Sequence, residues 1–143
     1  MFDIKTRNVA SKRKNKDKSP WLTSILVVVG GEGSDDDAVR LACELLNSDR
    51  GELYIVYVIE MERGLPLDAE VAPATAKAEA VLKHMEEVAS PFKCNTQAEL
   101  LQSRGVGLAV VQEAVDKQVD AIVLGIPYRE RYGIFSMGDS IPY

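Results

Sequence analysis

The sequence is poor in the residues that build disulfide, metal and triad chemistry, with two cysteines, one histidine and one tryptophan in 143 residues. Cys43 and Cys94 stand alone, without a CxxC pair or zinc-site spacing, which predicts two reduced thiols packed against apolar neighbours. His84 is expected in the middle of a helix, facing solvent, and leaves no second histidine for catalysis. The residue types therefore argue against a metal centre and a Ser–His–Asp triad.

Long apolar runs are also missing. No stretch approaches the ~20 residues that a membrane-spanning helix needs. The first 21 residues are charged throughout and lack the apolar centre of a signal peptide. With two cysteines expected to be reduced, this favours a cytoplasmic protein.

Charge is distributed unevenly along the chain. Residues 1–19 hold seven basic and two acidic residues, while the remainder holds ten basic and twenty acidic ones. This predicts a disordered basic arm over residues 1–20 and a single α/β domain over residues 21–143. The arm has the charge to touch anionic surfaces, but it lacks the interleaved aromatics of a nucleic-acid site.

Apolar periodicity after Pro20 alternates between two kinds of segment. Short β-branched runs predict strands at 24–30, 52–60, 92–102 and 120–127, and amphipathic patterns predict helices at 33–47, 71–90 and 107–118, with another beginning at 138. Strands alternating with helices indicate a doubly wound parallel sheet with right-handed crossovers. Ligands bind such sheets beyond the strand carboxyl ends, which directs attention to the loops at 30–37 and 125–140.

The first of these loops reads GGEGSDDDA from Gly30. Amide groups at a glycine turn and at a helix amino terminus can hold an anion. Three aspartates follow Ser34, the expected helix N-cap, and they repel a phosphate unless Mg²⁺ bridges them. Helix capping and ligand contact both stay open here. The loop has neither the GxGxxG nor the P-loop pattern.

The second loop, VLGIPYRERYGIFSMGDS, is the stronger candidate for a ligand site. Gly125 at a strand end lets a ligand approach the backbone, and Gly138 and Ser140 lie where a helix begins. Arg129 could supply counter-charge. The alternative is a surface loop whose arginines are only solvated.

These segments together resemble the universal stress protein family over about residues 22–143. The resemblance rests on ILVVVGG, ELYIVYV, AVVQEAVDKQVDAIVLG and the glycine loop. It implies a role in stress response and a five-stranded doubly wound sheet of the adenine-nucleotide α-hydrolase-like kind. It also implies ATP binding through a Gly-x2-Gly-x9-Gly-Ser/Thr loop after the fourth strand, and homodimers formed through the fifth strand.

Gly125 and Gly138 match the first and third glycines of that loop, but Tyr128 and Asp139 replace the second glycine and the hydroxyl residue. A like charge ~4 Å from a phosphate costs about 4 kcal/mol at an effective dielectric constant near 20. We therefore expect weak ATP binding or none, with Mg²⁺ only alongside nucleotide. The expected cofactor contacts are Gly30, Gly31, Val58, Gly125, Arg129, Ser136, Gly138, Asp139 and Ser140, with no catalytic or metal residues.

The sequence as a whole favours a regulatory or binding domain over an enzyme. The alternatives are a nucleotide-independent accessory domain of a larger assembly such as a transporter, and an ATP-using enzyme of similar architecture. Val29 and Gly33 break the SGGxDS loop that such an enzyme would use. The sequence reaches Tyr143 where the family's last helix lies, so we expect four of its five strands, a domain shortened at its carboxyl end, and contact with a second copy or a partner protein.

Overall fold

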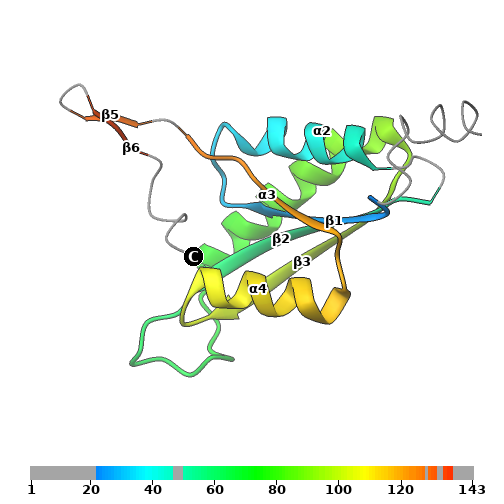
Figure 1. Ribbon diagram of the computed structural model, residues 1–143. Helices are drawn as coiled ribbons and strands as arrows, with labels where there is room; N and C mark the ends of the chain where they lie inside the picture. Colours follow the sequence, from blue (N-terminus) through cyan, green and yellow to red (C-terminus); the bar gives the residue numbers. More distant parts are fainter. Residues whose placement is uncertain (1–21, 47–49, 128, 132–133, 137–143) are drawn as a thin grey trace, which may run out of the picture.

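The computed structural model describes residues 22–46, 50–127, 129–131 and 134–136 (Figure 1). The elements are β1 (Ser24–Val29), α2 (Asp35–Leu45), β2 (Glu52–Glu60), α3 (Ala72–Ala89), the short 3-10 helix η1 (Ser90–Phe92), β3 (Asn95–Ser103), α4 (Val106–Lys117), β4 (Ala121–Leu124), β5 (Arg129–Arg131) and β6 (Ile134–Ser136). The predicted alternation of four strands and three helices is confirmed.

The central sheet has the order β3-β2-β1-β4, and all of its neighbouring strands are parallel. Helices α2 and α3 cover one face, and α4 lies on the other (Figure 1). The chain thus winds outward from β1 to β3 on one face and returns to β4 across the other. This confirms the predicted doubly wound α/β fold.

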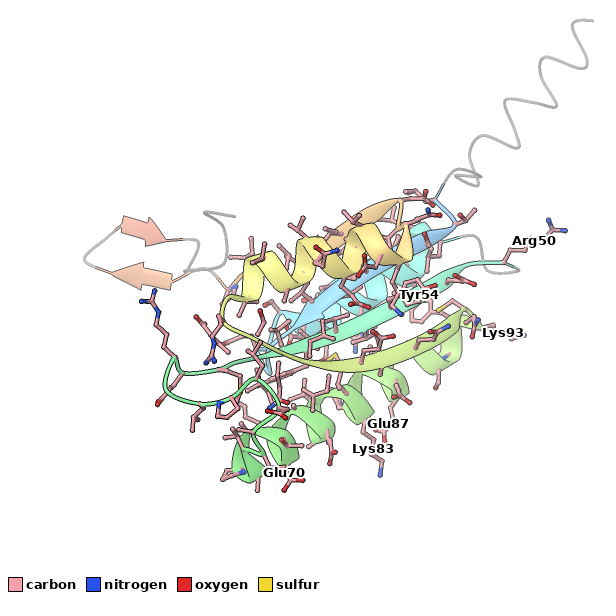
Figure 2. All side chains as sticks on the ribbon, turned by 90° about the horizontal axis from the view of Figure 1, so that it is seen from below. Arg50, Tyr54, Glu70, Lys83, Glu87 and Lys93 are labelled. Carbon is pink, nitrogen blue, oxygen red and sulfur yellow. The ribbon has the colours of Figure 1, made fainter. Side chains whose placement is uncertain are left out.

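The core forms because β1 and β2 are apolar on both faces, as buried parallel strands usually are. Ile25 and Val27 belong to the cluster packed with α2 and α3, whereas Leu26 belongs to the cluster packed with α4. The helices contribute the predicted apolar stripes, with Val39, Ala42, Cys43 and Leu46 buried after β1 and Leu82 and Met85 buried in α3. Lys83 and Glu87 point away from the sheet on the outer side of α3 (Figure 2).

Asp120 ties the first strand to the last strand of the sheet. Its Oδ2 accepts the amide N–H of Thr23 at 2.8 Å and of Ser24 at 3.1 Å, and the Thr23 hydroxyl at 3.0 Å. The two backbone hydrogen bonds, followed by the hydroxyl one, hold the pKa of this carboxyl below its ordinary value. The beginnings of β1 and β4 are therefore fixed side by side.

The segment after β4 differs from the expected open loop. The strand predicted to Pro127 ends at Leu124, and β5 pairs with β6 in an antiparallel hairpin set apart from the main sheet (Figure 1). In this hairpin Arg129 pairs with Ser136 and Arg131 with Ile134. The basic arm at 1–20 and the helix expected from residue 138 lie outside the described residues.

Candidate functional site

The carboxyl ends of three strands bring four of the predicted site residues to one end of the sheet. Val29 pairs with Tyr57 of β2, so Gly30 follows beside Val58. Val28 pairs with Leu124 of β4, so Gly125 follows beside Val29. Gly31 continues from Gly30 into the turn toward α2. These four residues, up to 95 positions apart in the sequence, therefore lie at one edge of the sheet, as strand order predicts. We call Gly30, Gly31, Val58 and Gly125 the glycine rim.

Asp35 closes the loop between β1 and α2. Its side-chain Oδ2 accepts three amide N–H groups, from Gly30 at 3.1 Å, Gly31 at 2.8 Å and Glu32 at 3.0 Å. Asp35 is only 2% exposed. Ionised acceptors make hydrogen bonds roughly twice as strong as neutral ones, which explains why this carboxylate gathers the loop around itself.

Ser34 stands at the N-cap position, as predicted, but it does not cap the helix with its side chain. Within the part of the chain that the structure describes, its buried hydroxyl oxygen has no hydrogen-bond partner. The predicted N-cap position is therefore confirmed, but the Ser34 hydroxyl does not supply the capping hydrogen bond. The charged carboxylate of the neighbouring Asp35 is the stronger acceptor. It accepts hydrogen bonds from the preceding loop instead of from the first turn of α2.

This arrangement changes what Gly30 and Gly31 can offer a ligand. Their amide N–H groups, which were expected to face an anion, are already bonded to Asp35. Both residues are nevertheless exposed, and no atom of the described residues lies within 4 Å of the place that a Gly30 Cβ would take. Gly31 has a φ of +85°, which a residue with a side chain rarely adopts. At Gly30 and Gly31 the rim thus presents bare backbone whose amide N–H groups are already bonded.

Gly125 has a packing role that the sequence analysis missed. A Cβ at this position would lie 2.5 Å from the carbonyl oxygen and 2.8 Å from the carbonyl carbon of Ser34. No side chain fits at such distances from backbone atoms. The absence of a side chain at Gly125 therefore lets the end of β4 approach the loop between β1 and α2.

Lys77 of α3 adds a positive charge that was not predicted. Its Cε lies 3.4 Å and its Nζ 3.9 Å from the position that a Cβ on Gly31 would take. Because α3 follows β2, its first turns must start at the carboxyl end of the sheet, and this topology is the signal that could have found the residue. The ammonium group of Lys77 thus lies beside Gly31 in the glycine rim.

The long loop between β2 and α3 is hydrogen-bonded to residues at the end of β3. Arg104 donates from Nη2 to the Leu65 carbonyl at 2.5 Å and from Nη1 to the Glu62 carbonyl. Gln102 donates from Nε2 to the Ala69 carbonyl at 2.9 Å. These contacts pin the loop to the end of β3, so the guanidinium of Arg104 is committed to protein carbonyls.

The remaining predicted residues are only partly placed. Arg129 and Ser136 face each other in backbone register in the β5–β6 hairpin. Gly138, Asp139 and Ser140 lie outside the described residues, so their contact with a ligand stays a prediction. Over the described ranges, no group of three or more His, Cys, Asp and Glu side chains could hold a metal ion. Nor is any helix there long and apolar enough to span a membrane.

His84 is exposed, as expected, but it is not isolated. Its Nε2 lies 3.1 Å from both carboxylate oxygens of Asp36 at the start of α2. This contact joins α3 to α2 on the outer side of the helical layer. The contact gives His84 a partner in the first turn of α2.

Comparison with solved structures supports this fold. The chain is similar to the universal stress protein from Archaeoglobus fulgidus, with 18% identity, 84% of this chain and 88% of that one covered, and a TM-score of 0.70. A universal stress protein family member from Burkholderia pseudomallei gives 22% identity, coverage of 74% and 83%, and a TM-score of 0.62. The Archaeoglobus fulgidus protein in complex with dAMP gives 17% identity, coverage of 71% and 79%, and a TM-score of 0.59.

At these identities, the structural matches establish a shared fold. Comparison with curated protein sequences finds no match. The sequence itself matches the Universal stress protein family over residues 22–140. This range includes all four strands of the main sheet and the segment that follows them. The chain belongs to the universal stress protein family.

Proposed function

We propose that this protein is a cytoplasmic, non-catalytic regulatory domain that binds an adenine nucleotide weakly at the glycine rim formed by Gly30, Gly31, Val58 and Gly125. The single observation that carries the proposal is the bare backbone at Gly30, open to 4 Å and next in register to Val58. The dAMP complex of a protein with this fold supports the ligand class.

The rim offers each part of a nucleotide a different surface. Exposed backbone at Gly30 and the partly buried Val58, which packs against the cluster under α4, supply an apolar edge for a base and ribose. Lys77 beside Gly31 supplies a charge for a phosphate. The amide groups of the first loop do not take part, because Asp35 holds them.

The number of phosphates should matter. Asp35, Asp36 and Asp37 occupy the first turn of α2, immediately after the rim. A phosphate charge held about 8 Å from a carboxylate costs roughly 2 kcal/mol at an effective dielectric constant of 20. Each added phosphate increases this repulsion, so AMP fits the described charges better than ATP.

Calorimetric titration tests the proposal. We expect AMP to bind more tightly than ATP with Mg²⁺, and ATP to bind with a Kd above about 100 μM. Gly30→Val should weaken AMP binding at least about tenfold, because the valine side chain fills the open rim. A tenfold loss corresponds to roughly 1.4 kcal/mol of binding free energy. Gly64→Val is the matched control, since that glycine also has nothing within 4 Å but lies in the loop after β2. Equal AMP affinity in both variants would contradict the proposed site.

A second candidate function, contact with a second copy of this chain, is favoured by one exposed apolar surface. We define the α4–β4 surface as Leu108, Val111, Val115, Ile122 and Leu124, of which Leu108 is 73% and Val115 65% exposed. An open groove of about 480 Å³ runs between α4 and β4, and Val111, Val115 and Ile122 line it. In the described sheet β4 has a neighbour on one side only. Exposed apolar patches of this kind mark contact sites.

The spacing along α4 supports self-association. Leu108, Val111 and Val115 recur at three- and four-residue steps, which is the spacing of a helix-pairing seam. Two such stripes can face each other across a twofold axis, because an isologous interface uses the same patch on both subunits.

Light scattering coupled to size exclusion tests this candidate. We expect the unmodified chain to dimerise at high concentration and Val115→Glu to remain monomeric, since the new charge would be buried in the seam. Glu86→Gln on exposed α3 serves as a control that should leave the dimer unchanged. A monomer at all concentrations for the unmodified chain would overturn self-association.

A further inference from the structure

Two thiols from distant parts of the chain meet beneath the helical layer. Cys43 belongs to α2, and Cys94 lies just before β3, 51 positions later. Their sulfur atoms are 3.7 Å apart, and both cysteines are free. The predicted apolar surroundings of both cysteines are confirmed, but their spacing in the sequence does not indicate that they lie together.

The geometry is close to that of a disulfide. The sulfur atoms must approach by roughly 1.7 Å to reach the ~2.0 Å of an S–S bond. Cys43 is held within α2, whereas Cys94 lies in the two-residue link between η1 and β3. Lys93, the other residue of that link, is labelled in Figure 2 and has a left-handed φ of 59°. The link belongs neither to a helix nor to a strand, so most of the movement falls to Cys94.

The two thiols differ in accessibility. Cys43 is 5% exposed, while Cys94 is only partly buried. Burial, followed by the nearby Cys94, raises the pKa of the Cys43 thiol to about 12, so Cys43 is protonated at neutral pH. A small oxidant therefore meets Cys94 first, and Cys43 is poised behind it as the second sulfur.

We propose that Cys43 and Cys94 form a reversible two-thiol redox site, which a peroxide oxidises to an intramolecular disulfide. This site is independent of the proposed nucleotide function. Cys43 lies near the carboxyl end of α2, about 12 Å along the helix from Asp35 at its beginning. A cross-link there joins α2 to the link that precedes the edge strand β3 and leaves the glycine rim unchanged.

The chemistry balances with hydrogen peroxide as the oxidant. The Cys94 thiolate attacks one peroxide oxygen, the O–O bond breaks, and hydroxide leaves and is protonated to water, giving a sulfenic acid. The Cys43 sulfur then attacks the Cys94 sulfur, forming the S–S bond and breaking the S–O bond. The departing hydroxide takes the Cys43 proton and leaves as a second water. The two thiols lose two electrons, which peroxide accepts, and a dithiol reductant reverses the reaction.

Intact-mass and peptide analysis of the peroxide-treated full chain tests the site. Trypsin cleavage after Arg40, Arg50, Lys93 and Arg104 places the cysteines in separate peptides, 41–50 and 94–104. We expect the chain to lose the mass of two hydrogens and the two peptides to become linked. The cross-link encloses β2 and α3, so the urea midpoint should rise and should fall back with dithiothreitol.

Two variants separate the roles of the sulfurs. Cys43→Ser should leave a Cys94 sulfenic acid that dimedone traps, and Cys94→Ser should leave Cys43 unmodified at the same peroxide dose. Three results in the unmodified chain would overturn the proposal: a sulfinic acid on Cys94 with Cys43 still open to alkylation after unfolding, linkage only between separate chains, or two unchanged thiols.

Discussion

Replacing Asp35 with alanine is expected to lower the free energy of unfolding by about 3 kcal/mol. The substitution removes the acceptor shared by the amide groups of Gly30, Gly31 and Glu32. A hydrogen bond to a charged group contributes roughly 1.5–3 kcal/mol, but these three residues are exposed and water can replace part of the loss. Urea denaturation measures the change as a lower midpoint.

Asp37→Ala is the matched control for Asp35→Ala. Asp37 is in the same first turn of α2, but its side chain is 86% exposed and its described ion pair is with Arg40 at 3.4 Å. Exposed pairs of this kind contribute about 0–1 kcal/mol, so its midpoint should stay close to that of the unmodified chain. Equal midpoints for the two variants would show that Asp35 does not organise the loop.

Gly125→Ala is expected to destabilise the fold by about 1–3 kcal/mol. The added methyl group would lie 2.5 Å from the Ser34 carbonyl oxygen, and a backbone atom cannot turn aside as a flexible side chain can. The end of β4 and the loop before α2 must therefore separate. Thermal unfolding of the variant measures the cost.

Gly30→Ala provides the comparison for Gly125→Ala. Gly30 lies at the same end of the sheet, yet none of the described residues comes within 4 Å of its Cβ position, and its φ is not positive. Its melting temperature should change little. A Gly125→Ala protein as stable as Gly30→Ala would mean that β4 does not approach the Ser34 backbone as closely as described.

Much of this fold could be predicted from the sequence because its strands are buried in a parallel sheet. The β-branched run from Ile25 to Val29 and the apolar run of β2 are covered on both faces of the sheet. Each strand therefore appears in the sequence as a nearly continuous apolar run. The third strand begins later than predicted, since Pro91 and the short helix η1 occupy the residues before it. Alternation alone does not resolve such a boundary.

The site was less predictable because its details depend on which atoms meet across the fold. The order of strands places Gly30, Val58 and Gly125 at one end, and this much follows from the sequence. Asp35 and Ser34 are adjacent and both suit a helix terminus, so composition cannot decide which one binds the loop. Cys43 and Cys94 are brought together only by the way α2 and the link before β3 pack in the folded core.

Amide chemical shifts recorded during an AMP titration report where the nucleotide binds even when its affinity is low. We expect the amide signals of the glycine rim, Gly30, Gly31, Val58 and Gly125, to shift together as AMP is added, while the signal of Gly64 in the exposed loop does not move. Shifts confined to the α4–β4 surface, or no shifts at millimolar AMP, would contradict nucleotide binding at the rim.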